Sequence, residues 1–211
     1  MRSVESAEQV GAKPNRRGMQ SREIVLAAAE RIMAEQGYEG TTLNRVVEES
    51  GIPISSVYHY FGSKDGLLIA VMERGAEHFL TQMPDVDQLI GTREEHLAAL
   101  TRVAAAALNE YPDFLRLVVV MTAQPPVDEA NHAAEVVRRV RSNTRAQIRR
   151  QVSVIFDTPA DGPIADRLAR FSLAMFDGTF IAQQSREDFQ LDYLVELLPP
   201  ALIGLYEKLG E

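Results

Sequence analysis

The chain has 211 residues, no cysteine and a formal net charge of −8, so it can bury a substantial core in one or two small domains. The lack of cysteine excludes disulfides, thiolate metal sites and cysteine nucleophiles. With no apolar run of about twenty residues and no signal-peptide core, we expect a cytoplasmic protein without a membrane span.

The negative charge is unevenly distributed along the chain. Residues 1–75 hold nine Lys/Arg against ten Asp/Glu, whereas residues 76–211 hold thirteen against twenty. Nucleic-acid binding needs a local positive face and not a basic whole, so the acidity does not exclude it. Basic residues gather between Lys13 and Arg22. Residues 1–18 are therefore expected to form a flexible basic arm that adds phosphate or minor-groove contacts, or an ordinary disordered tail.

Two helices are predicted after the arm. Residues 21–36 repeat apolar side chains at helical spacing, with Ser21 as a possible cap and Gly37 as the stop. Thr42 is the expected N-cap of a second helix over residues 43–50.

The segment 51–67, GIPISSVYHYFGSKDGL, is the most informative part of the chain. Its first glycine and its proline end one helix and open another, and Gly62 and Ser63 end this short helix in turn. Uncharged to basic and rich in hydrogen-bonding side chains, the short helix is suited to lie in a DNA major groove. Helix, helix, tight turn and short helix is the order of a helix-turn-helix DNA-binding domain.

Residues 24–71 resemble the N-terminal domain of tetracycline-repressor-type (TetR family) regulators. The matching elements are Gly37-Tyr38, Thr41-Thr42-Leu43, Gly51-Ile52 and Tyr58-x-Tyr60-Phe61-x-Ser63-Lys64-x-x-Leu67. Pro53 and Ile54 depart from the family, which usually has a capping serine and a polar or basic residue there. These departures concern which bases are read and not whether DNA is bound.

Eight residues are the predicted DNA contacts: Thr42, Arg45, Ser55, Ser56, Tyr58, His59, Tyr60 and Lys64. Ser55, Ser56 and His59 are candidates for base-edge contacts from the exposed side of the short helix. The two tyrosine hydroxyls, and Lys64 near a helix N-terminus, are expected to bind phosphates. The two residues that begin the second helix can reach the DNA backbone or a groove edge. The alternatives are aromatic rings that pack in the core and basic residues that are merely solvated.

The remaining chain reads as helices, so the predicted fold is all-α, with a helix-turn-helix domain over residues 19–66 and a ligand-binding and dimerisation domain over residues 67–211. Helices are expected over residues 65–81, 92–110, 114–122, 127–155, 164–184 and 188–209. Thr92-x-x-Glu95 is a capping box, and Asp113 can cap the short helix that follows. Pro199-Pro200 should interrupt or kink the last helix.

The last two helices carry more apolar residues than one buried stripe requires, so a second face can serve a partner subunit. The residues expected at the subunit contact are Leu168, Leu173, Phe180, Leu194, Leu198 and Leu202. The TetR resemblance implies the same arrangement, a homodimer closed by a four-helix bundle. Such a dimer would present two recognition helices to an approximately palindromic operator in double-stranded DNA.

The resemblance also implies a ligand pocket in each body, whose occupancy shifts the two DNA heads. The candidate lining residues are Phe79, Met83, Leu100, Phe114, Val118, Met121, Phe171, Met175 and Phe176, although such side chains are often plain core. The shortage of clearly buried charges predicts a small, largely apolar effector, and no cofactor is expected. The expected function is a ligand-responsive transcription regulator, a repressor rather than an activator.

An enzyme is the competing class. Glu129-x-x-His132 has the spacing of di-iron bundles, but it lacks a second copy. Gly62-Ser63-Lys64-Asp65 lacks the spacing of a phosphate-binding loop. No catalytic or metal-binding residue is therefore predicted. A further alternative, a ligand-binding or scaffold protein that keeps the head without using it, would show no salt-dependent duplex binding.

Overall fold

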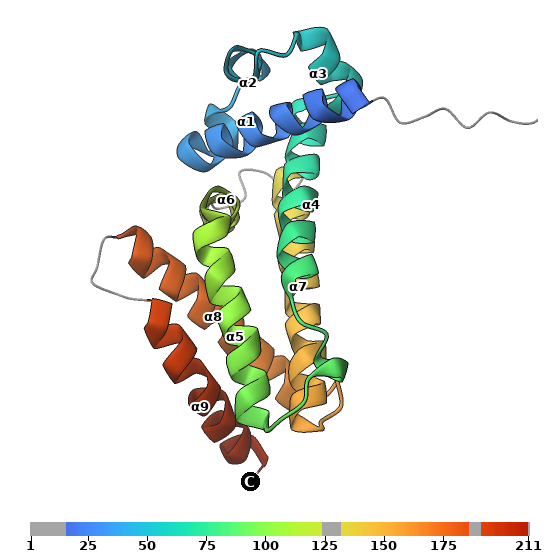
Figure 1. Cartoon of the computed structure of the whole chain (residues 1–211). Coiled ribbons are helices and arrows are strands. Elements are labelled where there is room, and N and C mark those ends of the chain that lie inside the picture. Colours follow the sequence, from blue (N-terminus) through green and yellow to red (C-terminus); the bar gives the residue numbers. More distant parts are fainter. Residues whose placement is uncertain (1–15, 124–131, 186–190, 211) are drawn as a thin grey trace, which may run out of the picture.

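The computed structural model describes residues 16–123, 132–185 and 191–210, and within these ranges every regular element is a helix. In chain order they are α1 (Arg16–Gly40), α2 (Leu43–Ser50), α3 (Ile54–Phe61), α4 (Lys64–Gln82), the short 3-10 helix η1 (Val86–Gln88), α5 (Arg93–Glu110), α6 (Pro112–Ala123), α7 (His132–Phe156), α8 (Pro163–Gln184) and α9 (Leu191–Gly210). Helices α1 to α3 form a head at one end of the molecule, and α4 runs from the head into the body (Figure 1). The predicted all-α fold class is confirmed.

The helix-turn-helix forms where the sequence predicts it. The Thr42 hydroxyl accepts the N–H of Arg45 at 3.2 Å and so caps the N-terminus of α2. Gly51 ends α2 at φ 67°, a left-handed conformation that favours glycine, and donates its N–H to the Val47 carbonyl at 2.9 Å. The turn before α3 therefore has a fixed geometry.

Side-chain capping differs between α3 and α4. Pro53 precedes α3 and provides no side-chain cap. By contrast, Ser63 accepts the N–H of Gly66 at 3.0 Å at the start of α4. The long helix α4 thus begins firmly at the base of α3.

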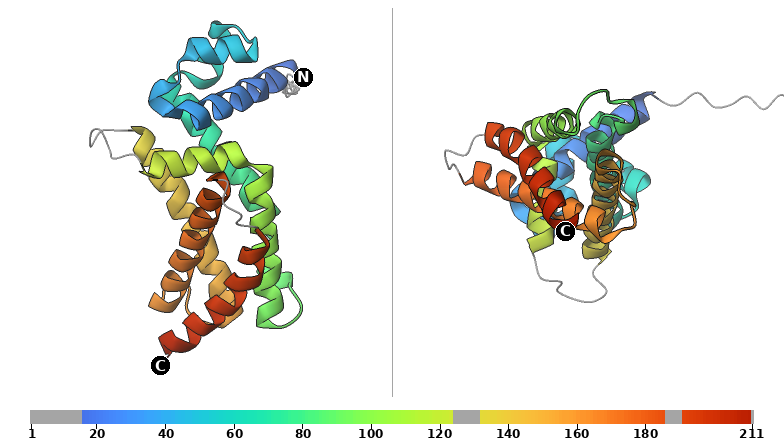
Figure 2. Two further views of the ribbon diagram at one scale, coloured as in Figure 1. Left: turned by 90° about the vertical axis from the view of Figure 1, so that its left-hand side faces the viewer. Right: turned by 90° about the horizontal axis from the view of Figure 1, so that it is seen from below.

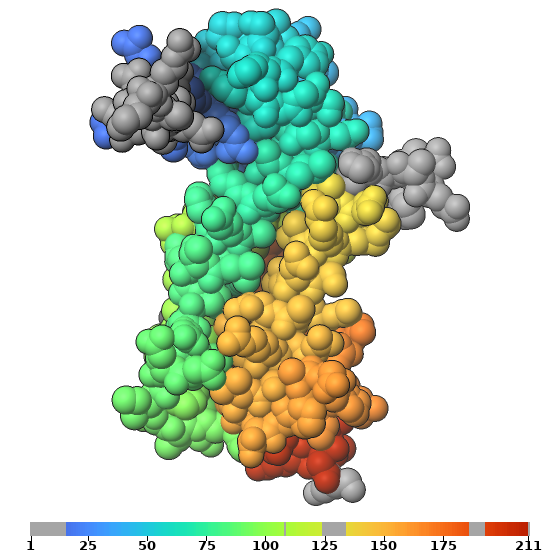
Figure 3. All heavy atoms as spheres, turned by 90° about the vertical axis from the view of Figure 1, so that its right-hand side faces the viewer, coloured from blue at the N-terminus to red at the C-terminus, as the bar shows by residue number. Residues whose placement is uncertain are grey.

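The head shares its hydrophobic core with the body. Its buried residues come from α1, α2, α3, α4, α6 and α7 and include Leu26, Met33, Val46, Val57, Leu67, Leu117 and Val137. Helix α6 lies crosswise beneath the head, and α1 packs on it (Figure 2). Helices α4 and α7 lie side by side below the head (Figure 3). Helix α4 begins before residue 66 and continues after it, and this core contains residues from both sides of that position. A domain boundary at residue 66 therefore stays a prediction.

A second core fills the far end of the body. Its buried residues include Val86, Leu97, Phe156, Leu168, Leu194 and Leu198. Helix α9 packs on both α5 and α8, and α8 also packs on α7.

Three details of the predicted elements were wrong. Helix α1 begins at Arg16, so residues 16–18 of the predicted arm are helical and Ser21 lies inside the helix. Helix α6 begins at Pro112, because a proline fits the first helical turn, where its missing N–H costs nothing. Helix α9 continues through both prolines, so the predicted interruption is wrong, whereas a kink there stays a prediction.

Parts of other predictions lie outside the described residues. They are the remainder of the arm (residues 1–15), the turn at residues 124–126, the start of the helix predicted over 127–155, and the start of the helix predicted over 188–209. Within the described ranges, no helix combines the length and apolar character needed to cross a membrane. The same ranges contain no group of three or more His, Asp or Glu side chains that could hold a metal ion.

Candidate DNA-binding surface and ligand cavity

Helix α3 divides its side chains between the core and the surface. Val57 is buried in the head core, which fixes the rotation of α3 about its axis. Ser55 and His59 are consequently exposed, as predicted, and Tyr58 is exposed as well, whereas Ser56, for which exposure was also predicted, is half-buried. A helix with this exposed face and without acidic side chains can present hydrogen-bonding groups to DNA base edges and phosphates.

Tyr60 belongs to a row of aromatic side chains at the end of α3. Its ring makes edge contacts with His59 and Phe61, with centroid separations of 5.5 and 6.0 Å. The guanidinium of Arg22 on α1 lies 5.4 Å from the Phe61 ring centroid, so it covers the Phe61 end of this row. Half-buried in this way, Tyr60 has an oriented ring and a restricted approach to any phosphate.

Lys64 lies at the junction of α1 and α4. Its Nζ atom is 4.2 Å from the ring centroid of Tyr38 and 3.4 Å from the carbonyl oxygen of Glu39. The Tyr38 hydroxyl donates to Asp65, and burial together with this hydrogen bond raises the pKa of Tyr38. The ammonium group is therefore positioned by neighbours far away in sequence.

Thr42 and Arg45 are both exposed at the start of α2. The Thr42 hydroxyl already accepts the capping bond but keeps its own hydrogen for donation. The structure thus presents the start of α2, the outer face of α3 and the start of α4 on one head, which is the arrangement that a helix-turn-helix uses on DNA.

A partly buried ion-pair cluster that was not predicted from the sequence joins the head to α4. Arg74 on α4 contacts Glu30 and lies 3.2 Å from Glu23, both on α1. Its side chain is 16% exposed, so this pairing is more shielded from solvent than an ordinary surface salt bridge. The partners lie too far apart in the chain for periodicity to reveal them.

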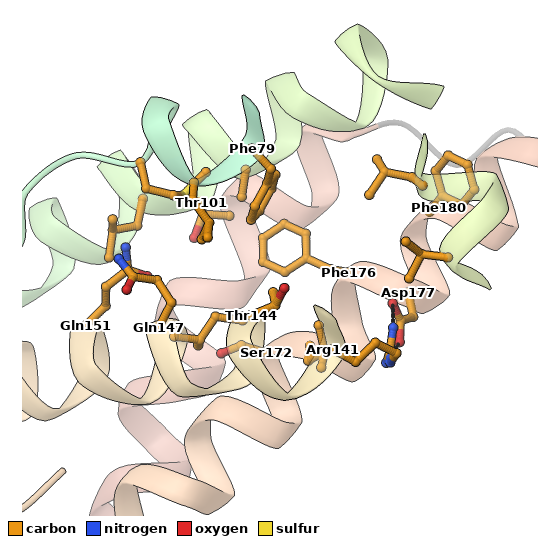
Figure 4. Close-up of a pocket in the computed structure, with 18 of the residues that line it drawn as sticks. Phe79, Thr101, Arg141, Thr144, Gln147, Gln151, Ser172, Phe176, Asp177 and Phe180 are labelled. Carbon is orange, nitrogen blue, oxygen red and sulfur yellow. Dashed lines mark hydrogen bonds and ion pairs between the residues drawn. The ribbon is translucent and has the colours of Figure 1, made fainter. Parts of the chain in front are cut away.

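A narrow cavity of ≈ 120 Å³ lies inside the body, between α4, α5, α6, α7, α8 and α9. Phe176 lies in the middle of the residues that line it (Figure 4). Six predicted ligand-binding residues line the cavity: Phe79, Met83, Leu100, Phe114, Val118 and Phe176.

The other three predicted ligand-binding residues do not line this cavity. Met121 lies in a neighbouring hollow, and Phe171 and Met175 pack against the second core. Apolar residues on one helix can face either a cavity or the core, and composition does not distinguish the two.

The cavity is more polar than the sequence indicated. Thr144, Gln147 and Gln151 line it from α7, and Arg141 donates to both carboxylate oxygens of Asp177 on α8. The Nε2 atom of Gln151 is buried without a hydrogen-bond partner among the described residues. Positions 141, 144, 148 and 151 recur at helical spacing, and this spacing is the signal in the sequence that could have indicated them.

A larger and more open hollow of ≈ 730 Å³ adjoins the cavity between the end of α6, α7 and α8. Arg141, Leu173 and Asp177 line both spaces, so they separate one from the other. We call the larger space the arginine hollow, because Arg138, Arg141, Arg145 and Arg170 line it.

The predicted subunit-contact residues are mostly core residues, which corrects the sequence-based prediction. Leu168, Phe180, Leu194, Leu198 and Leu202 are each at most 3% exposed within a single chain, and Leu173 lines the cavity and the hollow. A side chain with no exposed surface cannot bury more against a partner. The exposed residues of the same helices form other stripes, namely Ala174, Gly178 and Ile181 on α8, and Tyr193, Leu197, Ala201 and Gly204 on α9.

The sequence of the chain is similar to those of known bacterial regulators. Residues 25–71 match the family described as bacterial regulatory proteins, tetR family. The chain is 28% identical over 176 residues to the HTH-type transcriptional regulator BetI of Rhizobium meliloti, covering 82% of this chain and 80% of that protein. It is also 39% identical over 56 residues to the HTH-type transcriptional repressor AcnR of Corynebacterium glutamicum, covering 26% of this chain and 30% of that protein.

Solved structures share the fold over most of the chain. A TetR-family transcriptional regulator from Agrobacterium tumefaciens superposes with a TM-score of 0.67 at 14% sequence identity, covering 89% of this chain and 98% of that one. The likeness therefore includes the body as well as the head.

Proposed function

Because the chain belongs to the tetR family of bacterial regulatory proteins and is a transcriptional regulator rather than an enzyme, we propose that it binds a palindromic DNA operator as a homodimer and is released by a small effector molecule. The observation that carries this proposal is the outer face of α3, which presents Ser55, Tyr58 and His59 on a helix without acidic residues. We further propose that it acts as a repressor in the cytoplasm. The likeness to a protein named as a repressor supports the sign of regulation.

The proposed roles of the head residues on DNA follow from their exposure and their charge. Ser55 and His59 are the proposed readers of base edges, because both are exposed on α3 and both can donate and accept hydrogen bonds. Exposed Tyr58 is a proposed phosphate contact, and so is Lys64, which is half-buried but carries a charged ammonium group. Such contacts fix the register of the head on the duplex without reading sequence. Half-buried Ser56 and Tyr60 are proposed to contribute less than their neighbours.

The exposed stripes of α8 and α9 are proposed to form the dimer contact. Each combines small residues with apolar ones, and a Cβ atom added at Gly178 would meet no other atom within 4 Å. Small residues allow two helices to approach closely, while Ile181, Tyr193 and Leu197 supply apolar area for burial.

Helix α6 is the proposed link between the effector and the head. Phe114 and Val118 of α6 line the cavity, and both belong to the core that α6 shares with α1. An effector that fits the cavity only when α6 has moved would favour the state that does not bind DNA. A difference of about 1–3 kcal/mol between the two states is enough for a regulatory response.

Selection of the purified protein against a random pool of duplex DNA tests the proposal. We expect enrichment of one palindromic sequence and a steep loss of binding as salt concentration rises. The matched control is the His59→Ala variant, which should enrich the same palindrome with relaxed preference at one position of each half-site. The selection is repeated with protein from which bound small molecules have been removed by denaturation and refolding. If the folded dimer enriches no sequence in either form, the proposal is contradicted.

A further inference from the structure

The arginine hollow carries more positive charge than its own carboxylates neutralise. Arg141 pairs with Asp177, and Arg170 donates to Asp166 at 2.6 Å. Arg145 lies 3.9 Å from the same Asp166, so two carboxylates serve three guanidinium groups. Arg138 makes no ion pair with any other described residue.

The positive charges are arranged on one face of α7. Positions 138, 141 and 145 follow one another at intervals of three and four residues, which places them along one side of the helix. Guanidinium groups bind carboxylates and phosphates through paired, charge-assisted hydrogen bonds. A cation in this hollow would be repelled. An anion could accept hydrogen bonds from guanidinium N–H groups that the two carboxylates do not occupy.

The hollow adjoins the cavity, and the Arg141–Asp177 pair lies between the two spaces. Arg141, Leu173 and Asp177 line both spaces, and no other residue does. From Arg141 the cavity extends along α7 to Gln151, ten residues or about 15 Å farther along the helix. A ligand that occupies both spaces therefore needs an elongated apolar part joined to a head group at the Arg141 end. Figure 4 shows Arg141 beside Asp177 at one end of the cavity and Gln151 toward the other.

We propose that the effector is an anionic amphiphile, whose apolar part fills the cavity and whose carboxylate or phosphate lies in the arginine hollow. Arg138 and Arg145 bind the anion, and Arg141 exchanges its bond to Asp177 for a bond to the ligand. This inference rests on the proposed function, because it names the chemical class of the effector that the regulator senses. It refines the sequence-based expectation of a small, largely apolar molecule by adding an anionic group.

Four probes with the same chain separate the head-group chemistries: decanoate, decyl phosphate, decanol and decyltrimethylammonium. Calorimetric titration of the full-length protein, without DNA, should give an affinity for one of the anions at least about tenfold higher than for decanol. The better of the two anions identifies the head group as carboxylate or phosphate. Decyltrimethylammonium should bind more weakly than decanol.

The Arg138→Gln and Arg145→Gln variants test the site itself. Each should weaken binding of the preferred anion about tenfold while leaving the affinity for decanol unchanged. Arg167→Gln is the matched control, since Arg167 is exposed on α8 and does not line the hollow. Circular dichroism of each variant confirms that the fold is kept.

Several outcomes overturn the inference. They are equal or tighter binding of decanol or of the cation, an anion preference that survives both substitutions, and failure of all four probes to bind. If random-pool selection succeeds while these tests fail, the regulator senses another class of molecule. If selection fails while anion binding depends on Arg138, the anion site stands and the DNA-binding proposal falls.

Discussion

Lys64 shows how folding turns an ordinary lysine into a positioned group. Its ammonium lies over the Tyr38 ring, and Tyr38 is itself held by Asp65. These contacts restrict the side chain in the absence of DNA, so the proposed binding of a phosphate by Lys64 would cost less rotamer entropy.

We expect Lys64→Ala to weaken binding to all duplexes alike, because a phosphate contact reads no sequence. The slope of log K against log salt should fall in magnitude by about one. Lys208→Ala at the exposed end of α9 is the control and should leave the slope unchanged. A slope that stays the same in the Lys64 variant would remove Lys64 from the DNA interface.

Gln151 differs from Lys64, because its side chain is buried and its amide N–H donor has no partner among the described residues. Its Nε2 atom lies against the cavity without a partner among the described residues, and an unsatisfied buried donor costs about 1–3 kcal/mol. We therefore expect Gln151→Leu to raise the free energy of unfolding of the ligand-free protein by about 1 kcal/mol. Denaturant titration measures this change, with Gln147→Leu as a neighbour of greater exposure. A lower free energy of unfolding would mean that Gln151 is already satisfied.

Helices α4 and α6 meet at a point where only glycine fits. A Cβ atom on Gly75 would overlap the ring of Phe114, and Phe114 also lines the cavity. The close approach therefore connects the wall of the cavity directly to the helix that leads to the head.

Gly75→Ala should lower the free energy of unfolding by about 1–3 kcal/mol, because the added methyl group overpacks this contact. Combining it with Phe114→Ala should cost less than the sum of the two single changes, since the smaller side chain makes room for the methyl group. Thermal unfolding of the three variants gives the coupling. Strict additivity would show that the overlap is relieved elsewhere.

Sequence reasoning worked best where a local rule decides the structure. The Thr42 cap, the Gly51 turn and the Thr92 capping box were all predicted correctly, because a few neighbouring residues determine each of them. It failed where distant segments meet. The Arg74 ion pairs join α4 to α1, and the burial of Leu194 depends on α9 packing against α5 and α8.

The prediction of a subunit contact was limited in the same way, because it depends on how distant helices pack. An excess of apolar residues predicted a second apolar face on α8 and α9, and exposed Ile181, Tyr193 and Leu197 fit it, but the face nearer the core could not be recognised without the neighbouring helices. The cavity was predicted in part for the same reason, since Phe176 lines it whereas Phe171 on the same helix does not.

The proposed dimer depends on the exposed stripes, in which Leu197 is 58% exposed. Leu197→Glu would bury a charge in the subunit contact, so we expect monomers in sedimentation experiments. Binding to a palindromic site should then weaken strongly, because the two heads no longer bind together. Ala106→Glu on the exposed side of α5 is the control and should remain dimeric. A dimeric Leu197 variant would place the subunit contact on another face.

The core that joins α1 and α4 to α6 and α7 also limits how such regulators can exchange parts during evolution. A head grafted onto a foreign body would place its α1 against an α6 that was not selected to fit it, and mismatched apolar surfaces would be left open to water. A chimera that keeps α6 with its own α1 avoids this mismatch. If the outer face of α3 reads the operator, as proposed, new operator specificity is easier to acquire by substitution on that face than by recombination at the end of the helix-turn-helix.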